Sequence, residues 1–139
     1  MHLKISTFAL AALFAAPTLA LAIGAGDQAP PWTARDLQGH TVKFPRDVKG
    51  APTVLLFWAT WCPYCHAFIP ELNGIQKDYA RYGVHMLAID FAETGDVAAY
   101  IEKLGFPLHV IMHGDPIAKA YGVKYTPGLM VVDGGGTVV

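Results

Sequence analysis

Apolar residues along this chain recur with two different periods, and the two periods alternate. Pro52 to Ala59, PTVLLFWA, is an unbroken β-branched and aromatic run, which is typical of a strand buried on both faces. In the next segment, apolar residues recur at three- and four-residue spacing, which predicts an amphipathic helix with four inward residues, Phe68, Leu72, Ile75 and Tyr79. The chain thus places a buried strand shortly before a long helix.

The same alternation continues to the end of the chain. Further strands are predicted over residues 39–44, 84–91, 106–112, 128–133 and 137–139. Residues 115–122 form a short helix, and residues 93–105 form a longer one that ends at Gly105 and turns four residues inward, Val97, Tyr100, Ile101 and Leu104. Strands that alternate with helices predict an α/β domain whose sheet is covered on both faces.

The N-terminal segment differs from the rest of the chain. A basic start precedes an apolar run of small residues that ends in the A-x-A signal Ala20-Leu21-Ala22. We interpret residues 1–22 as a signal peptide and residues 23–139 as the exported domain. The alternative is an uncleaved membrane anchor, because residues 5–23 approach the ~20 apolar residues that span a bilayer. The A-x-A signal favours cleavage.

Length and charge restrict the function classes. At 139 residues the chain fits one domain with a sizeable core, and the N-terminal run accounts for part of its apolar fraction of 53%. The formal net charge of −1 leaves no basic footprint. Since phosphate binding needs clustered Lys and Arg, we expect no nucleic-acid partner.

Six residues, Trp61 to His66 (WCPYCH), carry the candidate chemistry and fit three kinds of site. A C-x-x-C pair is a redox dithiol or half of a zinc site, and C-x-x-C-H is also the attachment signature of a c-type haem. The chain has only two cysteines and cannot build a four-thiolate zinc site. Haem attachment would consume both thiols and leave the strand before the motif unexplained. A copper site made from Cys62, Cys65 and a histidine stays open.

The predicted elements give the two cysteines different environments. Cys62 falls at the N-terminus of the predicted helix, and Cys65 falls one turn inside it. Unpaired N–H groups and the positive end of the helix dipole favour a thiolate there and lower the pKa of a cysteine. We therefore expect Cys62 to be the nucleophile and Cys65 to resolve a mixed disulfide.

Three stretches of the chain match a known family in order and spacing. They are GDQAPPWT at residues 26–33, VKGAPTVLLFWATWCPYC at 48–65 and AYGVKYTPGLMVVDGGG at 120–136. Together they resemble the TlpA/ResA-like thiol-disulfide oxidoreductases of bacterial envelopes, thioredoxin-superfamily proteins of the AhpC/TSA-Redoxin type. The resemblance implies a thioredoxin-like fold, with a central mixed β-sheet flanked by helices and an N-terminal β-hairpin extension.

The resemblance also implies roles for residues outside the dithiol. Pro127 is expected to take a cis peptide bond facing the disulfide, and the backbone of Thr126 to pair with a substrate strand. Trp61 is expected to shield the dithiol. In the DFAE stretch, Glu93 falls where family members carry an acidic residue, and we predict that it tunes the pKa of Cys65 or relays its proton.

The residues between and after the cysteines leave the direction of electron flow open. Family members commonly place Pro just before the second cysteine, whereas this chain has Pro63-Tyr64, the order of glutaredoxins and some periplasmic isomerases. His66 is expected on the helix surface, where partial positive charge favours the Cys62 thiolate. The alternatives to a reductase are therefore a disulfide donor or isomerase, and the copper-binding chaperone.

The resemblance implies a monomeric periplasmic protein, released or membrane-tethered, that exchanges disulfides with envelope proteins. It implies client proteins such as apocytochrome c and a membrane electron donor or acceptor. We expect neither a bound metal nor a dissociable cofactor, because the dithiol carries the electrons. Family members continue beyond the position of Val139 with a last strand and a covering helix. Either the domain is truncated here or one sheet face is exposed, and a missing helix would leave an apolar patch.

Overall fold

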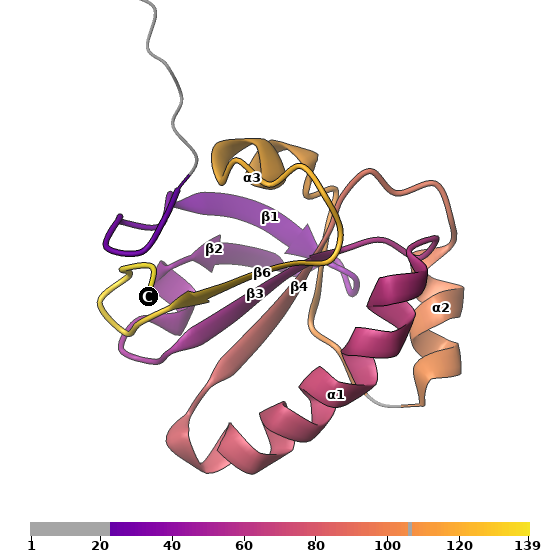
Figure 1. Cartoon of the computed structure of the whole chain (residues 1–139), viewed down its shortest axis with the longest axis horizontal. Coiled ribbons are helices and arrows are strands. Elements are labelled where there is room, and N and C mark those ends of the chain that lie inside the picture. The colour runs from indigo at the N-terminus through magenta and orange to yellow at the C-terminus, as the bar shows by residue number, and fades with distance from the viewer. Residues whose placement is uncertain (1–22, 106) are drawn as a thin grey trace, which may run out of the picture.

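The computed structural model describes residues 23–105 and 107–139 (Figure 1). The predicted signal peptide, residues 1–22, lies outside the described residues. Among the described helices, none combines the length and the apolar character that crossing a bilayer requires.

Six strands form one mixed sheet in the order β2-β1-β5-β4-β3-β6. Strand β3 lies inside the sheet, parallel to β4 and antiparallel to β6. Strand β5 runs parallel to β4 and antiparallel to β1. The bounds of the strands are β1 Trp32–Asp36, β2 Thr41–Phe44, β3 Thr53–Trp58, β4 His85–Asp90, β5 Val110–Met112 and β6 Gly128–Val132.

Helices cover both faces of the sheet, as the alternating pattern predicts (Figure 1). Helices α1 (Pro63–Tyr79) and α2 (Val97–Leu104) pack on one face, where Leu56 and Trp58 of β3 point. Helix α3 (Asp115–Ala120) packs on the other face, against Leu55 and Phe57. Short 3-10 helices span Arg46–Val48 and Ala80–Tyr82. The fold is the predicted thioredoxin-like α/β fold.

The N-terminal hairpin is confirmed, and it belongs to the main sheet. Strands β1 and β2 pair antiparallel, and β1 also pairs with β5. The chain before β1 joins the chain after β6: the N–H of Gly26 donates to the Val138 carbonyl at 2.8 Å, and the N–H of Ala29 donates to the Gly136 carbonyl at 2.9 Å. The two ends of the domain therefore hold each other in place.

Two predicted strands differ most from the structure. Residues 107–109 are irregular, and β5 begins only at Val110, since Pro107 has no N–H to donate to a neighbouring strand. Residues 137–139 form isolated bridges rather than a strand: Thr137 pairs with Gln28, and Val138 with Val132. Because Thr137 and Val138, which follow the 133–136 turn, pair with two different segments of the chain, residues 137–139 do not form one strand.

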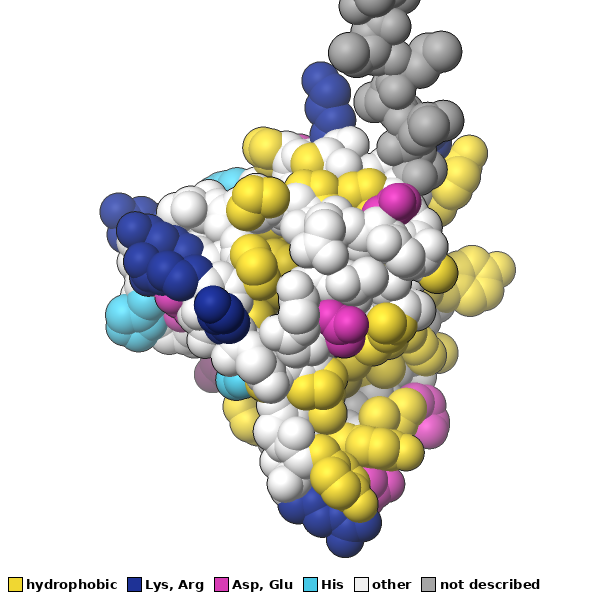
Figure 2. All heavy atoms as spheres, turned by 90° about the vertical axis from the view of Figure 1, so that its left-hand side faces the viewer, with side chains coloured by type: hydrophobic (Ala, Val, Ile, Leu, Met, Phe, Trp, Pro, Cys, Tyr) yellow, Lys and Arg dark blue, Asp and Glu magenta, His cyan; other side chains and the backbone are white. Residues whose placement is uncertain are grey.

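The inward face predicted for helix α1 is partly wrong. The buried residues are Cys65, Ile69 and Leu72, while Ile75 is 48% exposed and Tyr79 52% exposed. The inward stripe thus begins at Cys65 and ends at Leu72. Beyond Leu72, Ile75 and Tyr79 border an open apolar groove of about 380 Å³. The sheet and the residues just before β3 and β4 form its other walls, with Pro52, Val54, Val84, Met86 and Val131. In Figure 2, hydrophobic side chains run from the centre to the lower right of the view, while basic side chains lie at the left, top and bottom edges.

Two isoleucines on α1 test this burial pattern. Ile69→Ala should reduce the free energy of unfolding by about 2–5 kcal/mol, because Ile69 is fully buried. Ile75→Ala should cost about 1 kcal/mol at most, since half of its side chain is exposed. Urea unfolding of the two variants measures both values. Equal losses would mean that Ile75 is as well covered as Ile69.

Candidate active site

The two cysteines lie where β3 leads into α1. Cys62 has an extended backbone (φ −84°, ψ 109°) and is the N-cap residue of α1, and Pro63 is the first helical residue. The N–H of Cys65 donates to the Sγ atom of Cys62 at 3.2 Å. Both are free thiols that are almost completely buried. The predicted arrangement, with one sulfur capping the helix and the other one turn inside, is the one observed.

The environment separates the pKa values of the two thiols. Burial alone would raise the pKa of Cys62, but the Cys65 thiol, the Thr126 side chain and two backbone N–H groups stabilise its thiolate and bring the pKa below the ordinary value. Burial raises the pKa of Cys65 to about 12, and the neighbouring Cys62 adds to the increase. Of the two sulfurs, Cys62 therefore ionises more readily, and Cys65 keeps its proton while the Cys62 thiolate is present.

A pocket of about 310 Å³ lies beside Cys62. Its walls come from the motif, the end of β4 and the segment before β6, and its lining residues are Trp61, Cys62, Pro63, Tyr64, Phe91, Ala92, Lys124, Tyr125 and Thr126. The peptide bond between Thr126 and Pro127 is cis, as expected. Trp61, Tyr64 and Tyr125, which line this pocket beside Cys62, are 53%, 75% and 82% exposed.

Glu93 contacts the turn before Cys62. Its carboxylate accepts hydrogen bonds from the Thr60 N–H and the Thr60 hydroxyl, both at 2.6 Å, and from the N–H groups of Thr94 and Gly95 at 2.8 and 2.6 Å. Burial would raise its pKa, but these donors hold it below the ordinary value. Within the described residues none of its hydrogen bonds comes from Cys65, so the predicted proton relay stays a prediction.

Helix α2 contributes a residue that sequence reasoning did not assign to the site. Tyr100 stacks on the ring of His66 with centroids 4.9 Å apart and also packs against Trp58. Burial raises the pKa of Tyr100, and the charges of Cys65 and Cys62 raise it further. The available signal was the inward stripe of 93–105, which brings one face of this helix toward the motif.

Phe91 and Ala92 were also missed. They follow the carboxyl end of β4, which is the parallel neighbour of β3. Because sites in such sheets form at the carboxyl ends of adjacent strands, this position alone would have placed them beside the motif.

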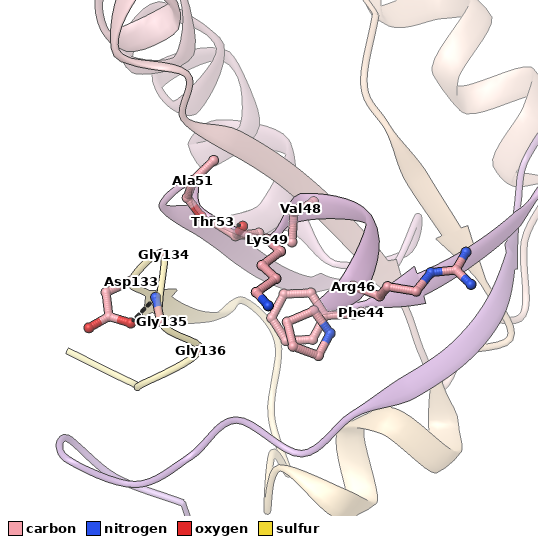
Figure 3. Close-up of a pocket in the computed structure, with 11 residues that line it drawn as sticks. Phe44, Arg46, Val48, Lys49, Ala51, Thr53, Asp133, Gly134, Gly135 and Gly136 are labelled. Carbon is pink, nitrogen blue, oxygen red and sulfur yellow. Dashed lines mark hydrogen bonds between the residues drawn. The ribbon is translucent and has the colours of Figure 1, made fainter.

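A second pocket, of about 360 Å³, lies at the other end of β3 (Figure 3). Phe44, Thr53 and the glycine turn 134–136 line it, with Arg46 and Lys49 at its rim. It contains no cysteine and no histidine. Within residues 23–105 and 107–139, no three His, Cys, Asp or Glu side chains are grouped so that they could hold a metal ion. The structure therefore adds no ligand to the dithiol for the copper-binding alternative.

Comparison with known proteins identifies the family. The model of the AhpC/TSA family matches residues 25–139, which is most of the chain. The chain belongs to the AhpC/TSA family. Its relatives place this AhpC/TSA domain among the TlpA/ResA-like members of the thioredoxin superfamily, in agreement with the sequence motifs.

The relatives of this AhpC/TSA domain are named for disulfide chemistry. It is 34% identical over 117 residues to the thiol-disulfide oxidoreductase ResA of Bacillus thuringiensis, an alignment that covers 82% of this chain and 66% of the relative. A structure of the DsbE-type thiol:disulfide interchange protein of Chlorobium tepidum has a TM-score of 0.76 at 29% identity, covering 84% of this chain and 83% of that one. A secreted disulfide oxidoreductase of Mycobacterium tuberculosis has a TM-score of 0.65 at 25% identity, covering 78% and 80%.

The pH dependence of thiol reactivity tests the separation of the two pKa values. Cys62 should react with iodoacetamide along a single titration whose midpoint lies below the ~8.5 of an ordinary cysteine. Cys65 should stay unmodified across that range, because its pKa lies at about 12. Mass mapping of the alkylated peptides as a function of pH measures both. Equal labelling of the two cysteines at neutral pH would contradict the assignment of the nucleophile.

Proposed function

We propose that this protein exchanges disulfides with other proteins through Cys62 and Cys65. The observation that carries the proposal is the contrast between the two sulfurs. The Cys62 sulfur caps α1 and has a lowered pKa, whereas the Cys65 thiol is buried and has a raised pKa. The names of the relatives support it, and the chain spans 66% of the length of the Bacillus relative. Activity, clients and partners are therefore proposed here for the chain itself.

In the reductive direction the Cys62 thiolate attacks one sulfur of a client disulfide. A bond forms between Cys62 and the client, the client S–S bond breaks, and the second client sulfur leaves as a thiolate that takes up a proton. Cys65 then loses its proton, and its thiolate attacks the Sγ atom of Cys62. This second step forms the Cys62–Cys65 disulfide, breaks the bond between Cys62 and the client, and releases the remaining client sulfur as a thiolate. Two electrons have then passed to the client, and its two thiolates take up one proton from Cys65 and one from solvent, to which Cys62 had lost its own.

The same geometry explains how Cys65 becomes reactive at the right moment. Part of the increase in its pKa comes from the hydrogen bond and the charge of Cys62. The charge of Cys62 disappears when Cys62 enters a mixed disulfide, so the pKa of Cys65 then falls, while burial still holds it above the ordinary value. Cys65 therefore stays protonated until a mixed disulfide forms on Cys62.

The pocket beside Cys62 is the proposed client-binding groove. Thr126, next to the cis proline, interacts with the nucleophile, and its backbone is available to pair with an extended client segment. Exposed aromatic rings on three sides supply apolar contact for residues next to the client cysteine. Trp61 and Tyr64 together with Tyr125 therefore select for protein clients over small disulfides.

For location and pathway we propose export to the periplasm, with residues 1–22 as a signal peptide or a membrane tether. The clients are envelope proteins, with apocytochrome c as one candidate, and a membrane partner supplies or accepts electrons. We propose net reduction as the direction. The Pro63-Tyr64 pair between the cysteines makes a disulfide donor or isomerase the alternative, because the intervening residues influence redox poise.

Equilibration with graded glutathione redox buffers decides the direction. A reductase should have a potential near or below about −270 mV, measured by alkylation of the thiols at each poise. A value near about −120 mV would instead make the protein a disulfide donor.

The two cysteines should fail differently when each is changed to serine. Cys62→Ser should abolish reduction of an insulin disulfide, because no nucleophile remains. Cys65→Ser should accumulate a mixed disulfide between Cys62 and the client, since the resolving thiol is missing. Non-reducing electrophoresis detects the adduct. An adduct with Cys62→Ser but not with Cys65→Ser would reverse the assigned roles.

Removing one aromatic ring of the groove should affect clients selectively. Tyr125→Ala should reduce kcat/KM for a folded protein disulfide by about tenfold, which corresponds to about 1.4 kcal/mol of lost contact, and leave reduction of a small aromatic disulfide nearly unchanged. Tyr82→Ala, at an exposed tyrosine remote from the pocket, is the matched control. Equal losses for both substrates would mean that Tyr125 acts on the dithiol rather than on the client.

A further inference from the structure

We propose that the loop between β4 and α2, residues 91–96, is a positioning element for Cys62 and that Glu93 is its positioning residue, acting through Thr60. The inference rests on the proposed function in one respect: it takes Cys62 as the nucleophile. It assigns Glu93 a task other than proton transfer to Cys65.

All three polar groups of Thr60, its N–H, its hydroxyl and its carbonyl, make hydrogen bonds. Its N–H and its hydroxyl both donate to the Glu93 carboxylate at 2.6 Å, one to each oxygen. Its carbonyl faces Nε2 of His66 at 2.5 Å, one turn into α1. A residue two positions before the nucleophile is therefore fixed from both sides, by the loop and by the helix that Cys62 caps.

Two further features show that the loop is shaped for this contact. The indole N–H of Trp61 donates to the Ala92 carbonyl at 2.8 Å, and Ala92 has a positive φ of 52°, which is uncommon for a residue with a Cβ. At Gly95 a Cβ would lie 2.2 Å from the Thr60 hydroxyl and 3.3 Å from a Glu93 oxygen. Only glycine leaves room for the two side chains to meet.

The surroundings of the Glu93 carboxylate favour its role as a hydrogen-bond acceptor over a role in proton transfer. The N–H groups of Thr94 and Gly95 donate to the same oxygen that the Thr60 hydroxyl uses. Four donors hold the group ionised, and a charged acceptor makes stronger hydrogen bonds than a neutral one. The loop is thus a rigid base that anchors the 60–62 turn.

The consequence for Cys62 is geometric. Its sulfur is stabilised by N–H groups only while the turn keeps it at the helix N-terminus, 3.2 Å from the Cys65 nitrogen. Releasing Thr60 lets the turn move, and the thiolate then loses part of that stabilisation. The pKa of Cys62 should therefore rise when the anchor is removed.

Thr60→Val and Thr60→Ser test the hydroxyl contact. Valine keeps the shape but removes the donor to Glu93, so alkylation of Cys62 at pH 6 should slow by about tenfold, one unit in pKa. Serine restores the hydroxyl and should return the rate to near the wild-type value. If valine and serine variants with the same melting temperature react alike, the proposal is overturned.

Glu93→Gln and Asp96→Asn separate anchoring from charge. Asp96 caps α2 in the same loop by accepting from the Ala99 N–H, and within the described residues the hydrogen bonds of Thr60 go to Glu93 and His66, not to Asp96. If Glu93 acted by its charge alone, removing it would lower the pKa of Cys62 and speed alkylation, and Asp96→Asn would act in the same direction. The anchor predicts the opposite sign: slower alkylation in Glu93→Gln and an unchanged rate in Asp96→Asn. Faster alkylation in Glu93→Gln overturns the proposal.

Insulin reduction by the same proteins keeps this test distinct from that of the proposed function. A wild-type protein that reacts with iodoacetamide at Cys62 but reduces no protein disulfide would contradict the function and leave the anchor standing. A Glu93→Gln protein that alkylates normally but resolves the mixed disulfide slowly would support the proton relay and overturn the anchor.

Discussion

The hydrogen bond from the Cys65 N–H to the Cys62 sulfur is the contact on which the site depends. It exists because β3 ends at Trp58 and α1 begins at Pro63, so that Cys62 takes the N-cap position that oxygen-bearing side chains usually fill. The same turn places Cys65 on the buried side of α1, which packs against the sheet. One local geometry thus makes one sulfur reactive and keeps the other protonated, and the sheet on both sides of β3 holds that geometry in place.

Much of this arrangement follows from the sequence, because it rests on local signals. The run from Val54 to Trp58 is apolar at every position, which is typical of an interior strand, and Pro63 suits the first turn of a helix. Together they fix where the dithiol lies. The cis bond before Pro127 followed from family resemblance, since no local pattern distinguishes it from an ordinary proline.

Other parts of the structure depend on contacts that periodicity does not encode. Ile75 and Tyr79 have helical spacing, yet the stripe that meets the sheet runs through Ile69 and stops at Leu72. A pattern gives the period of a helix but not how far its neighbour extends. The same holds for Thr60 and Tyr100: each reaches the site through a partner from another segment, Glu93 or His66, and only the folded chain brings these pairs together.

The joint between the two ends of the domain also bears on how the chain is made. The N–H groups of Gly26 and Ala29 donate to the carbonyls of Val138 and Gly136, so residues 26–29 can form these bonds only after residues 136–138 have been made. A chain that emerges from its N-terminus cannot complete the fold piece by piece. Cys62 and Cys65 lie between the two segments of this joint in the sequence, so both cysteines are made before the joint can form. Until residues 136–138 have been added, the fold that carries the dithiol lacks these bonds.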